Sequence, residues 1–516
     1  VTAYGAFYTS SIAIMQKLTI RGEGLRKQNF ALSIGLRSAL ATSGNTGSAA
    51  GFREHKKKTK ILHEKGKGRE VMATEKVELA ENTDTEDIDY SLSRVPAEAK
   101  QPFWRILFIR IGAICCVSQL MLGAALGFGM TFFDAFLATL FGSVLLQVVS
   151  WALGTAAAHE GLSISLLSRW AGLGKGGSAV FGGVVAISMV GWFGVQNCVF
   201  GQGMADIIPF TDFLGTQELI AGTGITGEYV LWAIITGIGI TLLVVFGIKA
   251  IANFATIFVP LFIIAVIWSA AIVLQGHSLG ELVVAAPPGP AMGMGAAITM
   301  VAGGFIAGAI CTPDYARYLK NGTQVFWMTL IGTFLGELGM NLIAALLANA
   351  MGTENVVDIM MGTSGVIGVV IVVASTVKLN DINLYSSSLG FATMLNALFN
   401  KALSRNTLVW ILGIAGTVLS VVGIINYFTD FLSLLGVAIP PVAGIMVVDY
   451  FILRRSRQIL DESREEGGLP KRVENWNPVA LIIWVVGFAI GEISSIINIG
   501  IPGLNSLILA GLLYWV

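Results

Sequence analysis

The stretch "STVKLNDINLYSS", Ser375–Ser387, decides the fold class because it sets charged and amide side chains inside a membrane-length run. Ten apolar or small residues, 365–374, precede it. Wound as a helix, it has two polar faces: Ser375, Lys378, Asp381 and Tyr385 on one, and Thr376, Asn380, Asn383 and Ser387 on the other. A lipid-facing helix excludes such charges, since each costs at least about 2.5–3.5 kcal/mol at mid-bilayer. The sequence therefore predicts an interior helix, enclosed by protein on both faces.

The composition extends this interpretation to the whole chain. Of the 516 residues, 54% are hydrophobic and only 12% are charged, about half the charge of a soluble protein. Repeated apolar runs of about 20 residues predict an all-α polytopic membrane protein. Twelve transmembrane helices are expected near 106–130, 132–157, 179–204, 229–248, 250–275, 295–316, 325–350, 365–398, 407–425, 428–452, 477–495 and 502–516.

The distribution of Lys and Arg predicts the orientation in the cytoplasmic membrane. The segments 205–228, 276–294, 351–364 and 426–427 contain no Lys or Arg. The loop 453–476, on the opposite side, contains Arg454, Arg455, Arg457, Arg464, Lys471 and Arg472. Both termini are therefore expected to be cytoplasmic.

The N-terminal region differs from the rest of the chain. Residues 1–100 hold 16 of the 32 Lys and Arg and no membrane-length apolar run. We expect residues 1–71 to be a non-native or disordered extension, because Gly68–Val71 can be encoded by a ribosome-binding sequence directly before Met72. The alternative is a real basic tail that binds anionic lipid. Residues 72–103 are expected to be a cytoplasmic tail.

The first and sixth predicted spans contain glycines that suggest interrupted helices. They read "IGAICCVSQLMLGAALGFG" (Ile111–Gly129) and "VAGGFIAGAICTPDYARYL" (Val301–Leu319). Interrupted spans at matching positions of two halves indicate a transporter site. The halves would be five-helix repeats, 104–275 and 295–452, inverted because each has an odd number of spans, with 477–516 adding two helices and possibly truncated. The alternative reading is close helix packing through small residues.

A few side chains in these spans suit a flat polar ring. Trp192 and Gln196 in "GWFGVQ" are four apart and share a helix face. The indole can stack on a ring while the carboxamide bonds its edge, although a packed Trp and a bridging Gln would give the same pattern. Phe305, beside Gly303 and Gly304, offers a second stacking face.

Two charge pairs have structural or functional interpretations. Asp314 and Arg317, at i and i+3, are expected to be a structural end-lock or an inner gate. Lys378 and Asp381 have the same spacing, and a buried ion pair that only fixes the helix is the alternative to a coupling role.

Other function classes find no support in the sequence. His55, His63, His159 and His277 lie in the tail or at span ends, so no metal site is expected. A P-loop for ATP is missing, as are a nucleophile–base pair and a nucleic-acid motif. We therefore expect a carrier rather than an enzyme, with no cofactor and no nucleic-acid partner.

Four motifs resemble the nucleobase:cation symporter-1 family, in its cytosine permease and purine–cytosine permease branch. They are "GWFGVQ", "GGFIAGAICTPDYARYLKN" (Gly303–Asn321), "NDINLYSSSLGF" (Asn380–Phe391) and "LLGVAIPPVAGIMVVDYF" (Leu434–Phe451). The resemblance implies a LeuT-type fold, a 5+5 inverted repeat plus two C-terminal helices. It also implies cation-coupled uptake of nucleobases or related heterocycles by alternating access.

The resemblance also implies site residues. Trp192 and Phe305 match the aromatics that sandwich the ring, and Gln196 and Asn380 match its hydrogen-bonding partners. Gly112 and Cys115 match backbone positions of a sodium site. The predicted substrate set is completed by Gly304, Ser375 and Asn383, and the broken-helix backbone by Cys116.

This chain departs from the family where Na⁺ would bind. Lys378 and Leu379 stand at the positions of two hydroxyl ligands, and neither supplies an oxygen. We therefore predict that the Lys378 ammonium replaces Na⁺ and couples transport to H⁺, with Asp381 setting its balance. The alternative is a cation-independent facilitator.

The pocket positions also depart from cytosine permeases. Those permeases carry polar side chains where this chain has Met189, Gly304 and Ala307, and an asparagine at Ser375. The loss of hydrogen-bonding groups favours a larger or less polar heterocycle. The remaining alternatives are an amino-acid or amine carrier on the same fold and, from a different class, an ion channel or a non-transporting membrane sensor.

Overall fold

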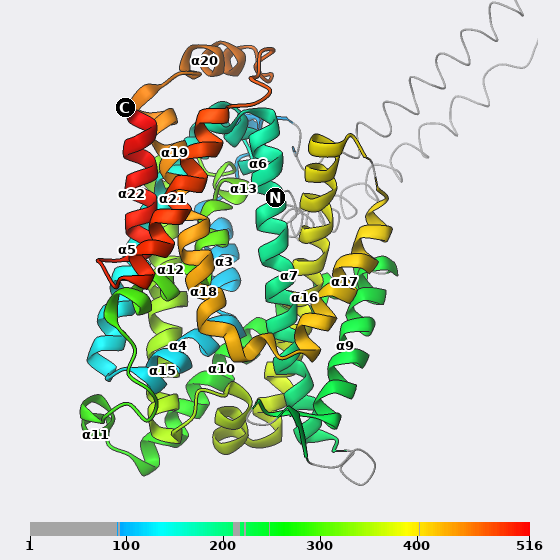
Figure 1. Ribbon diagram of the computed structural model, residues 1–516, viewed down its shortest axis with the longest axis vertical. Coiled ribbons are helices and arrows are strands. Elements are labelled where there is room, and N and C mark those ends of the chain that lie inside the picture. The colour runs from blue at the N-terminus through cyan, green and yellow to red at the C-terminus, as the bar shows by residue number, and fades with distance from the viewer. Residues whose placement is uncertain (1–89, 91–92, 210–216, 221–222, 247, 402) are drawn as a thin grey trace, which may run out of the picture. The chain divides into compact units, whose positions relative to one another are not determined.

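The computed structural model describes residues 90, 93–209, 217–220, 223–246, 248–401 and 403–516 (Figure 1). Residues 94–516 belong to one compact unit. The predicted extension 1–71 and most of the tail 72–103 lie outside the described residues. In the described part the chain is helical except for a small antiparallel pair, β1 (Glu218–Ile220) and β2 (Ile225–Thr226).

The helices follow the predicted spans in order. Those of the first half are η1 (Ala97–Ala99), α3 (Phe103–Ile114), α4 (Val117–Gly129), α5 (Phe132–Glu160), α6 (Ile164–Ser168), η2 (Arg169–Leu173), α7 (Gly174–Ile207), α9 (Gly227–Phe246), α10 (Ile248–Gly276) and α11 (Leu279–Val284). Those of the second half are α12 (Met294–Ile310), α13 (Pro313–Ala316), α14 (Gly322–Thr333), η3 (Phe334–Gly339), α15 (Met340–Met351), α16 (Val356–Phe399), α17 (Arg405–Val421), η4 (Ile424–Tyr427), α18 (Phe428–Ala438), α19 (Pro440–Val447), η5 (Val448–Leu453), α20 (Arg457–Glu465), α21 (Pro478–Ile496) and α22 (Pro502–Trp515).

These helices make the protein a multi-pass membrane protein. Within the described residues, eight helical segments are long and apolar enough to cross a membrane, or nine if the bent pair α3–α4 counts as one span. The count of twelve spans and the inverted repeat stay predictions.

Local sequence explains where the helices begin and end. The Thr131 hydroxyl accepts a hydrogen bond from the Asp134 backbone N–H at 3.2 Å and starts α5. Gly161 ends that helix in the left-handed conformation, with φ 67°. Proline at the first turn starts α19, α21 and α22, because its missing N–H is not needed there.

The first predicted span is broken at two cysteines. The α3 and α4 axes differ by 52°. Cys115 and Cys116 leave helical geometry, with ψ of 84° and 169°. Gly112 lies inside α3, one turn before the break.

The sixth span is broken later than its glycines suggested. Gly303 and Gly304 lie inside the continuous helix α12, and the break falls at Cys311 and Thr312, before Pro313. The expectation that the glycines interrupt this helix was therefore wrong. Gly303 instead allows close packing, since an added Cβ would lie 2.7 Å from the carbonyl carbon of Leu432 in α18.

The helix that contains the opening stretch is enclosed, as predicted. Thr376 and Asn380, on one predicted face, are fully buried, and Ser375 and Asp381, on the other, are at most 8% exposed. α16 packs against α7, α10 and α17, and Figure 1 shows it beside α7. It bends at Gly365, where φ is 62°.

Candidate functional site

A small cavity lies where the broken first span meets α7, α12 and α16. Its volume is about 40 Å³, space for about three water molecules. The lining residues are Ala113, Cys116, Ser118, Gln119, Met189, Trp192, Gln196, Gly304, Phe305, Ala307, Gly308, Leu379 and Asn383. The structure therefore brings together five of the seven predicted substrate residues.

Amide and hydroxyl groups from three helices meet at this cavity. The Gln196 Nε2 of α7 donates to Ser118 Oγ of α4 at 2.9 Å. The Asn383 Nδ2 of α16 donates to Gln196 Oε1 at 3.2 Å. Gln196 thus links α4, the second half of the broken span, to residues 375–387 of α16. Its two hydrogen bonds fix the orientation of the carboxamide.

Aromatic side chains form the other walls. Trp192 is 6% exposed and makes edge contacts with Phe428 and Phe431 of α18, with ring centroids 6.0 and 5.4 Å apart. Phe305 lines the cavity, and the guanidinium carbon of Arg110 lies 4.7 Å from its ring centroid. Arg110 is fully buried, and its guanidinium makes a cation–π contact with the Phe305 ring.

Two predicted substrate residues do not line the cavity. Asn380 is fully buried and its Nδ2 donates to the Phe193 carbonyl of α7 at 3.1 Å. Ser375 Oγ donates to the Ile371 carbonyl one turn earlier in α16 at 2.8 Å. Both side chains therefore brace α16 in this conformation.

The predicted coupling pair is only partly described. Lys378 belongs to α16, but its side chain lies outside the described part of the structure. Asp381 is buried at 8% exposure. Leu379 presents an aliphatic side chain to the cavity.

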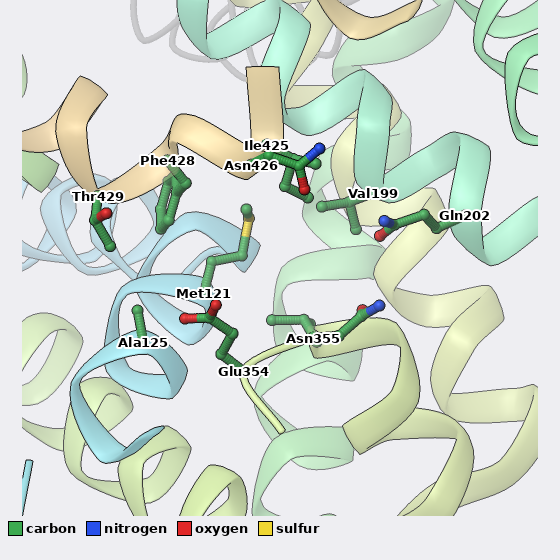
Figure 2. A pocket seen from close by; sticks show the side chains of 11 residues that line it. Met121, Ala125, Val199, Gln202, Glu354, Asn355, Ile425, Asn426, Phe428 and Thr429 are labelled. Carbon is green, nitrogen blue, oxygen red and sulfur yellow. The ribbon is translucent and has the colours of Figure 1, made fainter. Parts of the chain in front are cut away.

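A larger cavity lies next to the small one. Figure 2 shows its lining side chains, which come from α4, α7, the α15–α16 loop, η4 and α18. Its volume is about 230 Å³. Phe428 lines this cavity and also contacts Trp192, which lines the smaller one.

One carboxylate enters the larger cavity from the α15–α16 loop. Burial raises the pKa of Glu354, because the charged form loses solvation. The amides of Gln202, Asn355 and Asn426 share the lining. The lining is therefore mixed, with polar groups on both sides of the cavity, including Asn426 and Thr429 beside Phe428.

The Asp314–Arg317 pair has a different geometry from the predicted one. Asp314 Oδ1 accepts from the backbone N–H of Ile164 at 3.0 Å, which ties α13 to the start of α6. The Arg317 Nε donates to the backbone carbonyl of Asp314 at 3.0 Å. Its role as an end-lock or inner gate stays a prediction.

A buried charge cluster near this end was not singled out from the sequence. Glu160, at the end of α5, has a fully buried side chain that pairs with Arg94 at 2.9 Å and with Arg464 of α20 at 3.1 Å. The Tyr450 hydroxyl donates to Glu160 Oε1 at 2.7 Å. The cluster ties the N-terminal segment and the 453–476 loop to α5.

Arg110 and Glu337 were also missed, although a signal was present. Each is a lone charge in an otherwise apolar run, a pattern that marks functional positions in membrane helices. Among the described residues, no group of three His, Cys, Asp or Glu is placed to hold a metal ion.

A multi-pass helical bundle whose broken span borders an enclosed cavity has the architecture of a membrane transporter. Residues 95–515 match the family described as permeases for cytosine/purines, uracil, thiamine and allantoin. The chain belongs to this family. It is therefore a transporter rather than an enzyme.

Individual relatives agree with this assignment. The cytosine permease of Escherichia coli (strain K12) is 29% identical over 411 residues, which cover 79% of this chain and 90% of that protein. The hydantoin permease of Microbacterium maritypicum is 23% identical over 367 residues, covering 68% and 72%.

Two solved structures share the fold. The inward-facing conformation of Mhp1 aligns with a TM-score of 0.64 at 20% identity, over 82% of this chain and 93% of that one. The closed conformation of Mhp1, a nucleobase-cation-symport-1 family transporter with bromovinylhydantoin bound, aligns with a TM-score of 0.60 over the same shares.

Proposed function

We propose that this protein imports a nucleobase or a related neutral heterocycle across the cytoplasmic membrane by alternating access, coupled to H⁺. One observation carries the proposal. Trp192 and Phe305 face a cavity edged by the Gln196 and Asn383 amides. A flat ring can stack on the aromatic walls while the amides bond its polar edge.

The cavity chemistry disfavours the alternative carriers. In the described part of the chain, no Asp, Glu, Lys or Arg lines this cavity. An amino acid or an amine would bring a carboxylate or ammonium that needs a charged or dipolar partner. An uncharged ring has no such requirement.

The architecture of the proposal is a LeuT-type 5+5 inverted repeat plus two helices, with both termini cytoplasmic. The Lys and Arg distribution supports this orientation. The larger cavity is bordered by the Lys- and Arg-free segment around Glu354. We assign it as the outer vestibule, with Phe428 and Trp192 as the barrier between vestibule and site.

The proposal that H⁺ is the coupling ion rests on Lys378 and Leu379 of α16. Lys378 takes the place of a sodium ligand, and Leu379 fills the other place with carbon. A lysine in an apolar environment can lose its proton at neutral pH, so Lys378 would load and release H⁺ with Asp381 as its neighbour.

The test is uptake of labelled cytosine, adenine, hypoxanthine, uracil and allantoin by cells that express the full chain. It is run with and without Na⁺, with an uncoupler, and beside Lys378→Thr. We expect uptake of at least one base that an uncoupler abolishes and Na⁺ removal leaves unchanged. Na⁺-dependent uptake would overturn the coupling proposal, and uptake of amino acids alone would overturn the substrate class.

A further inference from the structure

The proposed mechanism leaves one buried carboxyl group without a role. Glu337 lies in η3, a π-helical segment within the α14–α15 span, and its side chain is fully buried. Neither carboxyl oxygen has a hydrogen-bond partner among the described residues. The Ser143 hydroxyl of α5 is near enough to the carboxyl group to act on it as a hydrogen-bond donor. A lone buried carboxylate is costly enough that such a group normally takes up a proton instead.

The position of Glu337 is set by close packing against the broken span. An added Cβ on Gly336 would lie 2.6 Å from Ile114, and one on Gly123 would lie 2.6 Å from the Asn341 Cα. The span containing η3 therefore touches α3 before the break and α4 after it. The π segment lies opposite the break, and π segments are frequent at functional positions.

Other buried polar side chains lie on α4, α5 and α15, the helices around η3. Gly123 of α4 packs against Asn341 of α15, and the Gln119 side chain, one turn earlier in α4, is buried. Thr139, Ser143 and Gln147 of α5, spaced four apart, share the face that Ser143 presents to Glu337. Oxygen atoms with no hydrogen-bond partner occur at Gln119, Thr139, Ser143, Gln147 and Asn341. Buried polar atoms are normally satisfied, so the helices packed around η3 carry several polar atoms whose partners the described residues do not supply.

Among the helices packed against η3, one charged side chain, Arg110, acts on Glu337. Of the elements packed against η3, α14 and α15 contain no titratable side chain, and α5 carries Asp134, His159 and Glu160 only at its ends. α3 contributes Arg105 in its first turn and Arg110 near its middle. Arg110 is the charge that acts on Glu337, and its Nη2 donates to Thr333 Oγ1 at 3.4 Å, one turn before Glu337.

Arg110 connects this site to the substrate cavity. Its Nη1 donates to the Tyr315 hydroxyl at 2.6 Å and its Nη2 to Ser150 Oγ at 3.2 Å. The guanidinium also lies over Phe305, which lines the cavity. Any movement of Phe305 toward or away from a substrate therefore changes the surroundings of the nearest cation to Glu337.

We propose that the Glu337 carboxyl is a proton-binding site of the transporter, linked to the substrate cavity through Arg110 and Phe305. In the conformation described, the group is a neutral carboxylic acid. When Arg110 approaches, the O–H bond breaks, the proton leaves to water, and the carboxylate pairs with the guanidinium. The link to transport rests on the proposed function, whereas proton binding at Glu337 does not.

The first test needs no substrate. Infrared difference spectra of the purified full chain are recorded between about pH 5 and pH 9, and the C=O band of a protonated carboxyl group is followed. We expect a band in this range that Glu337→Gln removes. The matched control is Glu492→Gln, a glutamate of the peripheral helix α21, which should keep the band. A band unchanged by Glu337→Gln would overturn the proposal.

The second test measures coupling in proteoliposomes with whichever base the wild type transports. Glutamine resembles the protonated acid, so Glu337→Gln should retain base exchange while losing accumulation driven by a pH gradient by at least tenfold. Glu337→Asp, which keeps a titratable group, should restore part of the pH dependence. Gradient-driven accumulation by Glu337→Gln at the wild-type level would overturn the proposal.

The two proposals fail separately. A wild type that transports no heterocycle, but whose carboxyl band depends on Glu337, would refute the proposed function and support the proton site. A wild type that couples a base to H⁺ without any change in Glu337→Gln would refute the proton site alone.

Discussion

Gly303→Ala is expected to destabilise the transporter, whereas the adjacent Gly304→Ala is not. An added Cβ at Gly303 would lie 2.7 Å from the Leu432 carbonyl carbon and 2.9 Å from the Gly436 nitrogen. The carbonyl oxygen of Leu432 lies closer still, so α18 must shift by well over the roughly 0.7 Å that the carbonyl carbon alone would require to restore an ordinary contact distance. Overpacking of this kind costs about 1–3 kcal/mol. The better helix propensity of Ala returns up to about 1 kcal/mol, so a net loss is expected.

Gly304 provides the matched control in the same turn of α12. An added Cβ there would lie 2.8 Å from Leu122 Cδ2, the end of a flexible side chain that can rotate. The assay is the melting temperature of each purified variant, and the affinity for the transported base is compared between Gly303→Ala and the wild type alone, because Gly304 lines the substrate cavity. We expect Gly303→Ala to melt lower and to bind more weakly, because α18 carries Phe428 and Phe431 against Trp192. Equal melting temperatures for the two variants would refute the packing argument.

Three further predictions address the site and the charged groups around Glu160 and Lys100. Trp192→Leu should weaken base binding by about 1–3 kcal/mol of stacking energy, which is roughly 5- to 150-fold in Kd by titration, and an unchanged Kd would exclude stacking. Glu160→Gln should lower the melting temperature, since it leaves the buried Arg94 without its carboxylate at a cost of about 3–5 kcal/mol; Asp461→Asn, at a more exposed pair, should change it little. Burial and the nearby Arg317 lower the pKa of Lys100 from 10.5 to about 8. The unfolded chain then binds more protons between these values, so stability should rise with pH from about 8 to 10.5, and Lys100→Gln should flatten that rise in melting curves.

The fold class and the enclosure of α16 were predictable because they depend on local composition. A run of about 20 apolar residues can be recognised without knowing its neighbours. Two polar faces on one membrane helix require protein on both sides, whichever helices supply it. Trp192, Gln196, Phe305 and Asn383 were likewise predictable, since each lies on a helix whose apolar surroundings make a polar or aromatic group conspicuous.

The positions of the helix breaks were not predictable from glycine content. Gly303 lies in a regular helix because α18 approaches it, and that contact joins segments far apart in the sequence. The hydrogen bond from the Asn380 amide to a carbonyl of α7 also joins distant segments, and the role of Asn380 at the substrate stays a prediction. The error over the glycines arose where a tertiary contact decided between two uses of the same residue type.

The contacts of α18 also constrain how a barrier at Trp192 can open. The middle of α18 is held where Gly303 of α12 meets the Leu432 backbone, while Phe428, its first residue, contacts Trp192 and lines the larger cavity, the proposed vestibule. The chain before it turns at Gly423, in the left-handed conformation with φ 80°. If transport proceeds by alternating access, opening toward the vestibule is therefore expected to pivot about the Gly303–Leu432 contact and to carry Phe428 away from Trp192. A larger side chain at position 303 would then affect the rate of opening as well as stability, because it alters the pivot itself.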